Sequence, residues 1–205
     1  VIVYRNITRI ADSLDPFDFS VSLALASGIT TAMVSAGRPS GDNPLIGATA
    51  VIKTSYGDLD QMLVKESVVQ QVVISNREWL RKTTFKQNLQ KAQSYLRKLA
   101  EYQKAKDKKK IEEPKKPRGL DEYIRLVRRQ VPAVVVASTV DDMLAALELV
   151  DEFGIRLILA DAVEAWIVAE QIAKRDVRVV ITPRQKRRPN EDISGPSGST
   201  LANAA

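Results

Sequence analysis

Residues 132–183 read PAVVVASTVDDMLAALELVDEFGIRLILADAVEAWIVAEQIAKRDVRVVITP, and this stretch decides the fold. Three short apolar runs, at 132–138, 155–161 and 177–183, alternate with two helical patterns. Strands that are apolar on both faces and separated by helices are typical of a parallel sheet that is covered by helices, with right-handed crossovers. The sequence therefore predicts a β-α-β-α-β unit.

Polar residues mark where the two helices of this unit should begin and end. Thr139 and Asp142 stand three residues apart before the first helix, and Asp161 and Glu164 have the same spacing before the second. Both pairs are typical of a capping box, in which the first side chain accepts a hydrogen bond from a free backbone N–H. Gly154 follows the first helix, where a left-handed residue commonly ends a helix.

The first half of the chain is expected to follow the same β/α rule less regularly. Asp15 is interpreted as the N-cap of a helix that continues to Ser27, and Gly28 as its C-terminal stop. A Gly-rich loop at 37–47 then separates two extended segments. The elements expected after the first helix are strands at 29–35, 45–53 and 67–75 and a short helix at 58–66 that Asp58 opens.

A long helical pattern begins near Glu78 and leads into the most basic part of the chain. Its apolar face is formed by Leu80, Phe85, Leu89, Ala92, Leu96 and Leu99. The net charge of +6 is concentrated at 97–118, which holds ten Lys or Arg against four Asp or Glu, so the remainder balances at 21 against 21. Pro114 and Pro117 are expected to end the helix. A solvated helix end with a flexible linker is favoured there over an anion or nucleic-acid site.

Composition limits the classes of function. The 205 residues include no histidine and no cysteine, so disulfides are excluded and the commonest general base and transition-metal ligands are missing. No apolar run approaches the roughly 20 residues that cross a bilayer. We expect a soluble protein, cytoplasmic or periplasmic, without membrane insertion. The chain begins at Val1 without an initiator Met, which is typical of part of a longer polypeptide.

One domain is expected, in three consecutive parts. Residues 1–96 form a first β/α part with the Gly-rich loop, residues 97–118 the Lys-rich helix end and linker, and residues 119–205 the second, β-α-β-α-β part of the same domain. The predicted fold class is α/β, with parallel β/α units.

Three stretches resemble the amidohydrolase superfamily, and the imidazolonepropionase-related branch in particular. They are DPFDFSVSLALASGITTAMVSAGRPSGDNPLIGATAVIKT at 15–54, the run from Val140 to Pro183, and SGPSGST at 194–200. Members of this superfamily are (β/α)8 barrels that hold one or two divalent metals at the C-terminal ends of their strands and hydrolyse amide or other C–N bonds. The resemblance implies a partial or degenerate TIM barrel.

The resemblance also shows which metal ligands this chain lacks. The opening His-x-His pair of the family would lie before Val1, and the Asp of the last strand after Ala205. Val136 or Ser138 stands where one strand-end histidine is expected, and Asp161 stands at or beside the next. Asp161 could bind a hard cation, but capping is the favoured interpretation. Glu78, near an acidic or Lys ligand of relatives, is interpreted as an exposed helix residue.

Zinc hydrolysis needs at least three protein ligands and an open position for water, which this chain does not supply in the usual form. One hypothesis is an amidohydrolase-like protein that has lost its metal site, needs no cofactor, and serves as a structural or assembly subunit, as a homo-oligomer or in a larger assembly. The alternative is an interior part of an active, divalent-metal-dependent hydrolase whose missing ligands lie outside this chain. Nucleic-acid binding is a weaker third interpretation, and whether the chain is an enzyme stays open.

If a ligand binds, it is expected where loops at the C-terminal ends of parallel strands converge. The candidate ligand-binding residues are Arg38, Ser40, Asp42, Asn43, Ser138 and Asp161. An equally weighted interpretation is that Gly37, Gly41, Asp42 and Asn43 only satisfy the geometry of turns.

Overall fold

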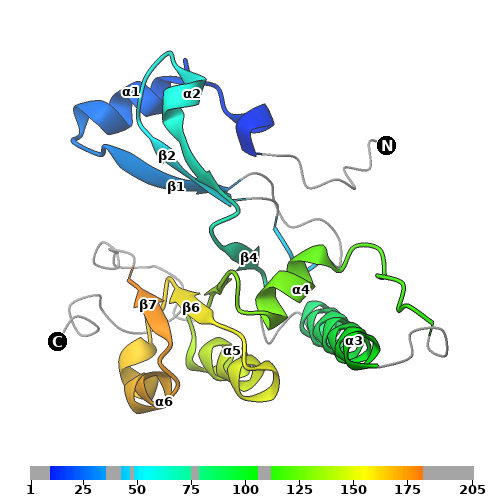
Figure 1. Cartoon of the computed structure of the whole chain (residues 1–205). Helices are drawn as coiled ribbons and strands as arrows, with labels where there is room; N and C mark the ends of the chain where they lie inside the picture. Colours follow the sequence, from blue (N-terminus) through cyan, green and yellow to red (C-terminus); the bar gives the residue numbers. More distant parts are fainter. Residues whose placement is uncertain (1–9, 36–42, 47–48, 75–78, 106–111, 182–205) are drawn as a thin grey trace.

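The strands that the structure describes form two separate sheets, one antiparallel with three strands and one parallel with four. The computed structural model describes residues 10–35, 43–46, 49–74, 79–105 and 112–181. Figure 1 shows the antiparallel sheet at the top of the molecule and the parallel sheet below it, connected through the chain that leads into β4. The predicted α/β class, with a parallel sheet of β/α units, is confirmed.

The parallel sheet has the order β4-β5-β6-β7. Pairing in register joins Val135 to Leu159 and Ile158 to Arg178, so the three strands of the predicted β-α-β-α-β unit lie side by side. Val135 and Leu159 are completely buried, and both belong to the core cluster that includes side chains of the helices. The strands span Gln70–Val72 (β4), Ala133–Val136 (β5), Leu157–Ala160 (β6) and Arg178–Val180 (β7).

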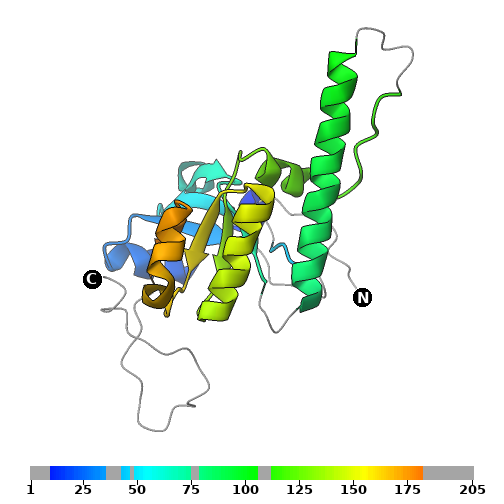
Figure 2. The ribbon, with the colours of Figure 1, turned by 90° about the horizontal axis from the view of Figure 1, so that it is seen from below.

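Helices α5 (Val140–Phe153) and α6 (Ala169–Lys174) lie together on one side of this sheet, as Figures 1 and 2 show. Thr139 caps α5, since its hydroxyl accepts a hydrogen bond from the Asp142 N–H at 3.3 Å. Gly154 ends α5 in the left-handed region, with φ 64°. Both boundary predictions for α5 are confirmed, because capping depends on residues adjacent in sequence.

The N-terminal half of the long helix α3 (Trp79–Lys104) lies beside α5, to which it is joined by ion pairs. Phe85, Leu89 and Ala92 are fully buried in the main core, as the predicted apolar face requires. Leu80, by contrast, is 42% exposed. The C-terminal half of α3 extends away from the body of the protein, and the chain that follows it returns alongside toward α4 (Asp121–Val127), as Figure 2 shows.

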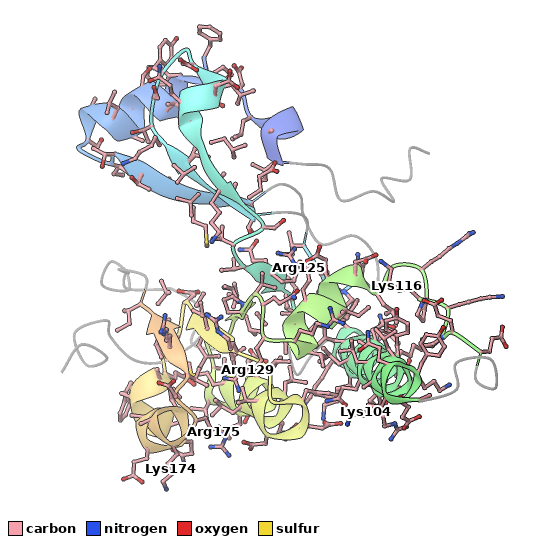
Figure 3. All side chains as sticks on the ribbon, viewed as in Figure 1. Lys104, Lys116, Arg125, Arg129, Lys174 and Arg175 are labelled. Atoms are coloured by element: carbon pink, nitrogen blue, oxygen red, sulfur yellow. The ribbon has the colours of Figure 1, made fainter. Side chains whose placement is uncertain are left out.

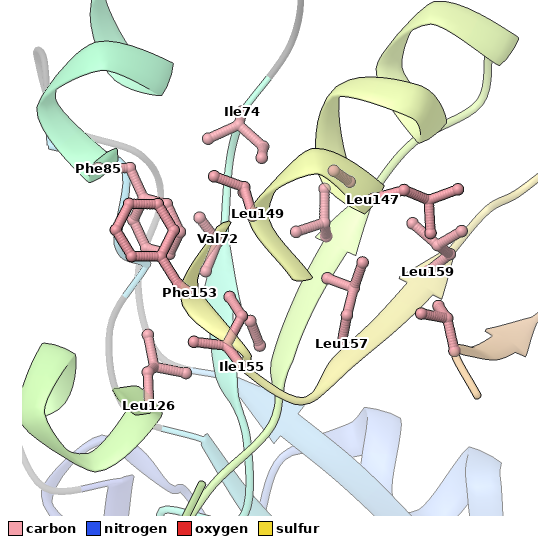
Figure 4. Close-up of a cluster of buried hydrophobic side chains, with 14 of the residues drawn as sticks. Val72, Ile74, Phe85, Leu126, Leu147, Leu149, Phe153, Ile155, Leu157 and Leu159 are labelled. Carbon is pink, nitrogen blue, oxygen red and sulfur yellow. The ribbon is translucent and has the colours of Figure 1, made fainter. Parts of the chain in front are cut away.

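Aliphatic side chains from both strands and helices fill the main core. Figure 4 shows Val72, Leu157 and Leu159 of the parallel sheet meeting Leu147 and Leu149 of α5. Burying each such side chain contributes roughly 1.5–3 kcal/mol. Because Phe85 and Leu126 belong to the same cluster, α3 and α4 fold as parts of this core.

The expectation that the first half continues the β/α rule is wrong for residues 31–66. There β1 (Thr31–Ser35), β2 (Thr49–Lys53) and β3 (Leu63–Glu66) pair antiparallel. Asp58 does cap helix α2, but this helix is one turn long, Leu59–Met62, and the residues after it are a strand. Periodicity could not separate these alternatives, because the helical and extended patterns of so short an apolar run overlap.

A second correction concerns the start of helix α1, which spans Phe19–Ala26. Its N-cap is Asp18, whose carboxylate accepts a hydrogen bond from the Ser20 N–H at 2.7 Å. Asp15 instead accepts from the Phe17 N–H at 2.9 Å and forms a turn before the helix. Gly28 follows the helix with φ 80°, in agreement with its predicted role as a stop.

Candidate functional site

The C-terminal ends of β5 and β6 bring two of the predicted site residues together. The Ala137 N–H donates to the Ala160 carbonyl at 3.0 Å, which continues the ladder beyond the two strands. Directly after it, the Ser138 hydroxyl donates to Oδ2 of Asp161 at 2.9 Å. Both side chains are half-buried. The sequence placed these residues at one sheet edge, and the parallel register explains why they meet.

The favoured interpretation made Asp161 the N-cap of the following helix, whereas the N-cap position of that helix is Glu164. The Asp161 backbone has φ 54°, in the left-handed region, and its carbonyl accepts from the Val163 N–H at 2.9 Å. The chain turns here before the 3-10 helix η3 (Ala165–Val168), whose N-cap position is Glu164. Asp is among the few non-glycine residues that tolerate this conformation.

Glu164 has a role that sequence reasoning missed. Its Oε2 accepts a hydrogen bond at 2.9 Å from the backbone N–H of Val140, the first residue of α5. The first N–H groups of a helix lack partners within the helix and favour a negative charge. Glu164 therefore ties the loop after β6 to the helix after β5. No local signal indicates this contact, since the two residues are 24 positions apart.

Asn43 lies at the same edge of the parallel sheet, beyond β4. Leu45 forms an antiparallel bridge with Val72, and the Val73 N–H donates to the Pro44 carbonyl at 2.8 Å. Two strand spacings therefore separate Asn43 from the end of β5, a distance of about 10 Å. The Asn43 side-chain oxygen accepts from the Leu45 N–H at 3.1 Å, which is a turn role.

Arg38, Ser40 and Asp42 lie outside the described residues, as do Gly37, Gly41 and Glu78. Ligand binding by the loop before Asn43, with Ser138 and Asp161, stays a prediction.

The side chains at the strand ends do not fit a zinc centre. Val136, at one position where a histidine is expected, is 47% exposed and carries no donor atom. Ser138 and Asp161 bind one another, and one carboxylate and one hydroxyl fall short of three ligands for zinc. In the part of the chain that the structure describes, no group of three or more His, Cys, Asp or Glu residues could hold a metal ion.

Comparison with known proteins supports the fold and leaves the activity open. No family model matches the sequence, and no curated protein matches it. A crystal structure of an amidohydrolase from Thermotoga maritima superposes with a TM-score of 0.69 at 23% identity. This chain has an amidohydrolase-like fold. The superposition covers 84% of this chain but 47% of the Thermotoga protein, so the chain spans about half the length of that amidohydrolase.

Proposed function

We propose that this amidohydrolase-like protein has lost its metal site and serves as a structural or assembly subunit. The observation that carries this proposal is the combination of strand ends without metal ligands and an apolar helix that the described chain covers only in part, through Val21. The imidazolonepropionase-related branch, which the sequence resembles, is part of the same proposal.

Helix α1 is the apolar helix in question. Its sequence FSVSLALA contains no charged residue, and none of its side chains is buried. Phe19 is 75% exposed and Leu23 is 56% exposed. A helix that is apolar on all sides normally lies in the interior of a protein, and large exposed apolar patches mark interaction sites. Figure 1 shows α1 on the outer side of the antiparallel sheet, away from the main core.

A second copy of this chain is the proposed occupant of this surface. From Phe19 to Ser35 the sequence has no charged residue, although the whole chain carries +6. Two copies could therefore meet through α1 without like-charge repulsion, whereas a contact through the basic residues at 97–118 would bring like charges together. A two-fold contact in which the same helix packs on itself is the simplest closed assembly.

The experiment measures metal content and molecular mass on the same preparation. We expect no stoichiometric metal by elemental analysis and a dimer or larger species by light scattering. Leu23→Glu should shift the mass toward the monomer, because it places a charge at the contact. Leu144→Glu, at a leucine of α5 that is 39% exposed, is the matched control and should leave the mass unchanged. A monomeric wild-type protein would contradict self-association through α1.

The alternative is an interior part of an active metal-dependent hydrolase that acts on C–N bonds. It is favoured by the coverage of 47% of the Thermotoga amidohydrolase, since the other half of such a fold could supply ligands. Under this alternative, near-stoichiometric Zn, Mn or Fe would accompany the protein in its full assembly. That result would overturn the structural proposal.

A further inference from the structure

A groove lies between the projecting helix α3 and the segment that returns beside it. Its volume is about 470 Å³, and its walls are formed by α3 between Gln87 and Lys98 and by residues 114–117. The returning chain and α3 run side by side in Figure 2, and Figure 3 labels Lys104 at the end of α3 and Lys116 on the returning segment. Two walls from different parts of the chain thus form one concave site.

The groove is lined by cations and hydrogen-bond donors. Lys91 and Lys98 stand on α3, Lys115 stands on the opposite wall, and no Asp or Glu is among the lining residues. None of these three lysines forms an ion pair with another residue that the structure describes. Ser94 and the half-buried Tyr95 lie between the two lysines of α3 and add hydroxyl groups.

Three nearby lysines, unlike those of the groove, have carboxylate partners. Lys82 binds Glu148 of α5 at 3.0 Å, and Lys86 binds Glu152 at 2.8 Å. Lys116, next to Lys115, pairs with Asp121. The lysines that face α5 or α4 therefore have carboxylate partners, whereas those in the groove present their charge to solvent.

The positive surface is short. Lys91 and Lys98 are seven residues apart, or about 10 Å along the helix axis. Toward the end of the projecting arm, a second hollow shares Lys98, Pro114 and Lys115 with the groove and is also lined by Glu101, Glu112 and Glu113. A long anionic backbone that continued along the arm would meet these three carboxylates. A short acidic segment would end before them.

We propose that this groove binds a short acidic segment of a partner protein in an extended conformation. Three extended residues also span about 10 Å, so carboxylates at that spacing could reach both Lys91 and Lys98, with Lys115 closing from the opposite wall. Lysine binds carboxylates as a mobile point charge, which suits a sequence-tolerant acidic motif. Nucleic acid is disfavoured because one aromatic ring, Tyr95, and no arginine line the groove.

The inference is independent of the proposed self-association, because α1 and the groove lie in different parts of the molecule (Figure 1). A protein that proved monomeric or metal-bound could still bind an acidic segment here. Likewise, a protein that bound no acidic segment could still be a metal-free oligomer. The two proposals can therefore fail separately.

The test is fluorescence anisotropy of a labelled hexaglutamate peptide titrated with the full chain at low salt. We expect saturable binding that weakens as ionic strength rises from about 0.05 M to about 0.5 M. Lys91→Gln combined with Lys98→Gln should weaken binding by about fivefold or more, since two charge interactions are removed. Lys115→Gln, on the other wall, should weaken it in the same direction. Circular dichroism confirms that each variant folds.

The matched control combines Lys65→Gln with Lys174→Gln, two exposed lysines outside the groove, and removes the same charge. This control should weaken binding of the peptide by less than about twofold. An equal loss in the control and groove variants would mean nonspecific attraction and would overturn the proposal. So would the absence of saturable binding, or tighter binding of an oligothymidylate of matched charge, which would indicate a nucleic-acid site.

Discussion

The Ser138 hydroxyl donates a 2.9 Å hydrogen bond to Oδ2 of Asp161, joining the ends of two neighbouring parallel strands. In an amidohydrolase-like fold this edge is where metal ligands are expected. Here the carboxylate of Asp161 serves a neighbouring loop, and its left-handed backbone turns the chain away from β6.

Replacing Asp161 by Ala should lower the free energy of unfolding by about 1–2 kcal/mol. The substitution removes the acceptor for Ser138 and places a residue with poor tolerance of positive φ at 54°. Asp161→Asn keeps an acceptor and tolerates the conformation, so it should cost clearly less. Urea unfolding of both variants measures the difference, and equal losses would contradict the role of the backbone conformation.

Replacing Gly154 by Ala should destabilise the protein by about 1 kcal/mol through backbone strain alone. Gly154 has φ 64°, and a Cβ added there would meet nothing within 4 Å. Gly154→Asn should recover part of the loss, because Asn adopts the left-handed conformation more readily. Thermal unfolding, followed by the helix-sensitive circular dichroism signal at 222 nm, would measure the stability of each variant. An Ala variant as stable as the wild type would show that the backbone at this C-cap is not strained by a Cβ.

Phe85→Ala should lower the free energy of unfolding by about 3–5 kcal/mol, because the ring is fully buried between α3 and the main core. Leu80→Ala, on the same helix at a side chain that is 42% exposed, is the control and should cost less than about 1 kcal/mol. Chemical denaturation of the two variants tests whether α3 belongs to the core. Similar small losses would indicate that α3 is only loosely attached.

The pKa of Asp151 should lie below its ordinary value, because the Arg175 side chain hydrogen-bonds the carboxylate and attracts its charge. The bidentate contact has distances of 2.8 Å from Nε to Oδ1 and from Nη2 to Oδ2. A lowered folded pKa means that this interaction stabilises the protein above the unfolded pKa and is lost as pH falls through the folded pKa. Arg175→Gln should raise the pKa of Asp151 toward its ordinary value.

Carboxyl-resolved NMR titration measures this pKa in the wild type and the variant. The stability difference between them should be constant at neutral pH and shrink as the pH drops below about 4. An unchanged Asp151 titration in the variant would refute the assigned cause.

Helix boundaries could be predicted where a capping residue lies directly beside the helix in the sequence. Thr139 and Gly154 lie beside the helix they delimit, so their side chain or backbone acts on that helix whatever the rest of the fold does. The N-cap of α1 was expected at Asp15 but lies at Asp18, because both carboxylates precede the apolar run and only the folded turn shows which one faces a free N–H of the helix.

The candidate site was predictable in position but not in chemistry. Parallel strands bring their C-terminal ends to one edge, and Ser138 and Asp161 do meet there. The spacing of Asp161 and Glu164 fits a capping box, yet Asp161 binds Ser138 and Glu164 binds the start of α5. Both contacts cross between βα loops, and nothing in a local pattern encodes them.

The sequence by itself determined the parallel β-α-β-α-β half of this protein, because apolar periodicity, caps and the handedness of crossovers leave one arrangement for it. The tertiary structure decided the antiparallel pairing of residues 31–66, since the alternation of apolar and polar residues in a strand does not specify the direction of the strand that pairs with it. It also decided that α1 stays exposed and that Lys91, Lys98 and Lys115 share a groove, because exposure and the meeting of distant residues depend on how the whole chain packs.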